Sequence, residues 1–75
     1  MTNAEKYINN RLTEIEEELS NCKLVKRKNA TIEYIETRMY QVGILIAIIG
    51  ITEDPVYSKR AFNLISIFNN AGYDQ

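Results

Sequence analysis

The chain has 75 residues, nine lysines and arginines against ten acidic residues, one cysteine and no histidine. A domain of this size rarely stabilises a monomer by more than about 3 to 5 kcal/mol, so small proteins often add disulfides, a metal or further chains. One cysteine excludes an internal disulfide, and the lack of histidine disfavours a zinc site. We therefore expect one domain, residues 1–75, that self-associates and holds no cofactor.

The first predicted helix covers about residues 3–27. Its apolar side chains recur at spacings of four and three, as in a coiled-coil seam. The members of this seam are Ile8, Leu12, Ile15, Leu19 and Cys22. The basic segment 23–28 would end the helix, where cations complement the helix dipole.

The second predicted helix covers about residues 31–51. Its seam is Ile32, Ile35, Met39, Val42, Ile46 and Ile49. This seam is out of phase with the first, which predicts a break near residues 28–30 and an antiparallel hairpin. In that hairpin Glu18 approaches Arg38, and Lys23 approaches Glu33. One continuous helix through the break remains an alternative.

The third predicted helix covers about residues 55–70. Asp54 and Pro55 are favoured at the N-cap and the first helical position. One stripe is formed by Tyr57, Ala61, Leu64, Phe68 and Ala71, and Gly72 marks the helix end. The fold class is therefore all-α: a hairpin of two helices plus a third, assembling as a helical-bundle oligomer.

The run VGILIAIIGI, residues 42–51, contains no polar side chain. Its β-branched residues favour a strand, but the seam that enters from Ile32 continues through it with helical spacing. A membrane span needs about 20 apolar residues, whereas the apolar stretch here, residues 39–52, has 14. The sequence thus favours a helix that is apolar nearly all round and must be covered, and it disfavours a membrane span.

Small residues mark the predicted self-association surface. Gly43, Ala47 and Gly50 share one helical face, and each glycine in a helix costs about 1 kcal/mol relative to alanine, which suggests close approach by a neighbour. A homodimer is the first expectation. The predicted self-association residues are Val42, Gly43, Ile46, Ala47, Ile49, Gly50, Phe62 and Phe68.

The residues needed for common enzyme chemistry are missing. Without histidine there is no Ser-His-Asp or Cys-His arrangement, and the glycine-rich phosphate-binding motifs do not occur. The glutamates of residues 14–18 would lie on a solvated flank without an apolar pocket to tune them. We therefore expect no enzymatic activity. Cys22 is expected to be a buried thiol, and the sequence leaves its role open.

These observations favour a non-enzymatic interaction protein of the inhibitor, adaptor or scaffold type. Such an oligomer would present the acidic residues Glu14, Glu17 and Glu18 to a basic site on a partner protein. One alternative is a nucleic-acid-binding regulator that uses the cations Lys23, Lys26, Arg27 and Lys28. Another is an oligomer that binds a small ligand between its subunits.

The start of the chain lacks the basic and apolar regions of a secretory signal, so a cytoplasmic location is expected. Eleven isoleucines and eight asparagines are typical of coding in an AT-rich genome. In length and style the chain is similar to short helical proteins of phages and plasmids and to small immunity proteins. It shares no motif with them, so the similarity assigns no site residues.

Overall fold

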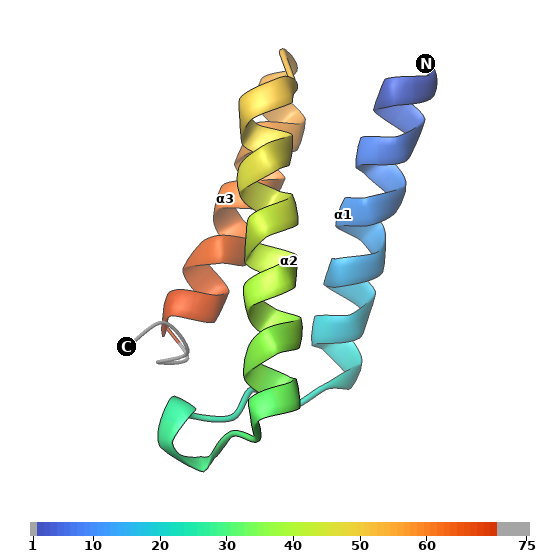
Figure 1. Cartoon of the computed structure of the whole chain (residues 1–75). Coiled ribbons are helices and arrows are strands. Elements are labelled where there is room, and N and C mark those ends of the chain that lie inside the picture. Colours follow the sequence, from blue (N-terminus) through green and yellow to red (C-terminus); the bar gives the residue numbers. More distant parts are fainter. Residues whose placement is uncertain (1, 71–75) are drawn as a thin grey trace.

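A computed structural model describes residues 2–70, and its α-helices there are α1 (Asn3–Asn21), α2 (Ile32–Ile51) and α3 (Pro55–Asn70). A short 3-10 helix, η1 (Arg27–Asn29), lies between α1 and α2. Residues 2–70 contain no strand, which confirms the all-α prediction. Figure 1 shows α1 and α2 running in opposite directions and α3 returning beside α2. The predicted antiparallel hairpin is confirmed, and the continuous-helix alternative is wrong.

Helix α1 begins as predicted but ends six residues early. Its start is a capping box, in which the Glu5 N–H donates to Thr2 Oγ1 at 3.1 Å and the Thr2 N–H donates to Glu5 Oε1 at 3.2 Å. Its end is Cys22, which has an extended backbone with φ −127° and ψ 138°. Leaving the helix here frees the next segment to turn its apolar side chains inward: Leu24 packs against the core, and the Val25 N–H donates to the Tyr34 hydroxyl at 3.0 Å.

The basic segment 23–28 therefore lies on the connection between α1 and α2, and its four cations are exposed. The last turn of α1 holds no basic residue, so the predicted role of these cations at a helix C-terminus is wrong. The predicted pair of Lys23 with Glu33 is wrong as well. In the part of the chain that the structure describes, the ion pairs are Arg11–Glu14, Arg38–Glu18 and Arg60–Glu16.

The starts of α2 and α3 follow the predicted capping chemistry. Thr31 Oγ1 accepts the Tyr34 N–H at 3.1 Å, and Asp54 Oδ1 accepts the Val56 N–H at 2.9 Å. Each oxygen satisfies a backbone donor that has no partner within the first helical turn. The bounds of both helices agree with the sequence prediction to within one residue. Ala71 and Gly72 lie outside the described residues.

All three helices contribute to the hydrophobic core. The buried apolar residues are Ile8, Leu12 and Ile15 of α1, Leu45 and Ile48 of α2, and Tyr57, Ala61, Leu64 and Phe68 of α3. The predicted stripes of α1 and α3 thus face inward, except that Leu19 and Cys22 are half-buried.

Helix α2 is rotated relative to the prediction. Of its predicted seam, Ile32, Met39 and Ile46 are 75%, 61% and 59% exposed. The residues that face inward are instead Arg38, Gln41, Leu45 and Ile48. The run 42–51 has no polar side to fix its orientation, so the orientation is set elsewhere, by two polar side chains that point into the bundle.

Candidate interaction face

A buried polar network fixes the inner side of α2. Arg38 Nη1 donates to Glu18 Oε1 at 2.9 Å and to Gln41 Oε1 at 2.7 Å, and Gln41 Nε2 donates to Glu18 Oε2 at 2.7 Å. Arg38 Nη2 also donates to Cys22 Sγ at 2.9 Å. Buried polar groups need such partners, and a guanidinium supplies several donors in one plane. The network therefore holds Arg38 and Gln41 toward α1.

The opposite side of α2 has no cover within the described chain. At about 100° per residue, the positions 39, 43, 46 and 50 form one stripe that points away from the stripe 38, 41, 45 and 48. We call Met39, Gly43, Ile46, Ala47 and Gly50 the outer face; all five are exposed. A Cβ atom built on Gly43 or Gly50 would meet nothing within 4 Å. The protomer itself gives no packing reason for these two glycines.

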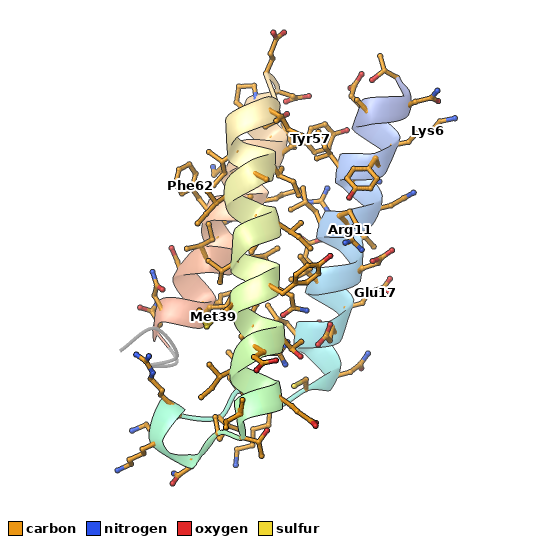
Figure 2. The ribbon with its side chains drawn as sticks, in the orientation of Figure 1. Lys6, Arg11, Glu17, Met39, Tyr57 and Phe62 are labelled. Carbon is orange, nitrogen blue, oxygen red and sulfur yellow. The ribbon has the colours of Figure 1, made fainter. Side chains whose placement is uncertain are left out.

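An exposed aromatic side chain lies on the neighbouring helix. Phe62 of α3 is 56% exposed. Figure 2 shows Met39 and Phe62 projecting on the side away from α1, which carries Lys6, Arg11 and Glu17. Singly exposed apolar side chains are common, but several of them beside two glycines are typical of a contact surface.

The predicted self-association residues fall into two groups. Gly43, Ile46, Ala47, Gly50 and Phe62 are exposed. The remaining three are covered by the protomer: Val42 and Ile49 are half-buried against the core, and Phe68 is fully buried. The structure adds Met39, which the sequence analysis placed in the seam of the second helix but not among the self-association residues.

The acidic residues predicted to bind a partner differ in their surroundings. The Glu14 side chain is 64% exposed and pairs with Arg11 at 3.2 Å, and Glu17 is exposed. Both carboxylate oxygens of Glu18 accept hydrogen bonds from α2. Glu18 thus holds the bundle together, which leaves Glu14 and Glu17 as the acidic surface of α1.

A second ion pair joins α1 to α3. Arg60 binds both oxygens of Glu16, at 2.6 and 3.2 Å, and donates to Asn9 Oδ1 at 2.8 Å. The hydrogen bond with Glu16 raises the pKa of Arg60, and burial opposes this shift. Beside the pair lies a cleft of about 590 Å³, whose apolar lining includes Leu19, Leu24, Leu64 and Ile67. Cys22 also lines this cleft, which lies within one chain.

Helix α2 is long and apolar enough, by length and composition alone, to cross a membrane. Its 18-residue window has a mean hydropathy of 1.3, and 22% of that window is buried in the bundle. The apolar window is therefore longer than the 14-residue stretch considered from the sequence. It includes Arg38, whose charge is paired with Glu18 on the inner side.

Comparison with known proteins adds no relative: no family model, curated protein or solved structure matches the chain.

Proposed function

We propose that the chain is a non-enzymatic protein that self-associates through the outer face of α2 and, as an oligomer, binds another protein. One observation carries the proposal: an apolar stripe with two glycines is exposed on the central helix of a very small domain. Fully burying such a side chain stabilises by about 1.5 to 3 kcal/mol, and Met39 and Ile46, which are 61% and 59% exposed, forgo more than half of this each. The two glycines cost about 1 kcal/mol each relative to alanine.

A closely packed second copy accounts for both costs. Its contact would bury the large side chains, and the glycines would let the two backbones approach. Light scattering over a concentration series tests this step. We expect a mass of twice 8.7 kDa. A monodisperse 8.7 kDa species at every concentration would overturn self-association.

The surface offered to another protein is the acidic flank of α1. Glu14 and Glu17 are exposed there and are separate from the outer face. We expect Glu14→Lys with Glu17→Lys to abolish partner binding while the oligomer mass stays unchanged, because both residues are exposed and lie outside the outer face. Lys6→Glu, on the same helix, is the control for a general charge effect. Partner binding that survives the double reversal would remove this flank from the proposal.

The basic connection supports a second candidate function, nucleic-acid binding. All four cations, Lys23, Lys26, Arg27 and Lys28, are exposed on the connection between α1 and α2, and two of them, Arg27 and Lys28, lie in η1. Phosphate contacts by such cations give affinity that falls steeply with salt. We expect Lys23→Gln, Lys26→Gln and Lys28→Gln together to lower both the affinity and its salt slope. Absence of binding to duplex and single strands at low salt would dismiss this candidate.

A further inference from the structure

We draw no further inference here: the strongest candidate, the apolar cleft between α1 and α3 beside the Arg60–Glu16 ion pair, carries none, because the two charged side chains already pair with each other and nothing in the structure shows what fills the cleft.

Discussion

Arg38 Nη1 lies 2.9 Å from Glu18 Oε1, and this ion pair joins α2 to α1 across twenty residues of sequence. The Arg38 side chain is 3% exposed, whereas that of Glu18 is 46% exposed. The cation is therefore the buried partner, and the carboxylate remains in contact with solvent. Because Arg38 must point toward α1, the pair determines which side of α2 is left outside.

The first prediction concerns this asymmetry. Glu18→Ala should destabilise the protein by about 1 to 2 kcal/mol, because it leaves a buried guanidinium without its carboxylate. Arg38→Met should cost less, about 1 kcal/mol, because it removes the buried charge and leaves Glu18 hydrated, and the remaining cost is that of Gln41 Oε1, which loses its donor. Urea unfolding at one fixed protein concentration measures both changes. Glu17→Ala is the matched control and should stay within about 0.5 kcal/mol. A larger cost for Arg38→Met than for Glu18→Ala would contradict this description of the pair.

The sequence predicted this ion pair correctly but predicted the rotation of α2 incorrectly. Arg38 and Met39 are neighbours, about 100° apart around the helix, so both cannot face α1. The predicted seam depended on isoleucines that surround the helix on every side, and such a pattern has no defined phase. The predicted contact between Glu18 and Arg38 does specify the rotation of α2. A buried ion pair fixes the rotation of a helix, whereas one apolar side chain among many can be exchanged for a neighbouring one.

The stripe of α1 was predictable because polar residues border it on both sides. The stripe of α3 was predictable from its helical spacing, although Ile65 and Ile67 lie beside it together with Ser58 and Arg60. The end of α1 was not, since the seam could be extended through Cys22 into the basic segment. What opposed this was packing at long range: Leu24 packs against the core, and Val25 bonds to Tyr34 of α2. At the candidate site, the two glycines could be identified from their spacing in the sequence. The exposure of Met39 could not be predicted, because it follows from the rotation of α2.

The second prediction concerns the link between α1 and α3. Arg60→Lys should destabilise the protein by about 1 to 2 kcal/mol, because an ammonium group cannot bind both oxygens of Glu16 and also reach Asn9. Thermal or urea unfolding measures the loss. Lys59→Arg, an exposed substitution one residue earlier, serves as the control and should be neutral. Equal stabilities for the two variants would show that the bidentate geometry contributes nothing.

The third prediction concerns pH. Burial acts to lower the pKa of Arg38, but its hydrogen bonds with Tyr34 and Glu18 outweigh this and raise the pKa. A raised pKa stabilises the fold at every pH below the unfolded-state value, and this stabilisation is lost only as pH rises through the folded value, which for arginine lies far above neutral pH. The chain also lacks histidine. Unfolding free energies at about pH 5.5, 6.5 and 7.5 should therefore agree within about 1 kcal/mol, and a steeper change would point to a titrating group outside these contacts.

The glycines of the outer face allow the most direct measurement of self-association. Sedimentation equilibrium compares the unaltered chain with Gly43→Leu plus Gly50→Leu, and circular dichroism follows the helix content of both. Leucine meets no obstacle within the protomer and favours the helix by about 1 kcal/mol per site, so the variant should remain folded. We predict a dimer of the 8.7 kDa chain before the substitutions and a folded monomer after them. A monomer before them, or an unchanged dimer after them, would contradict pairing through the outer face of α2.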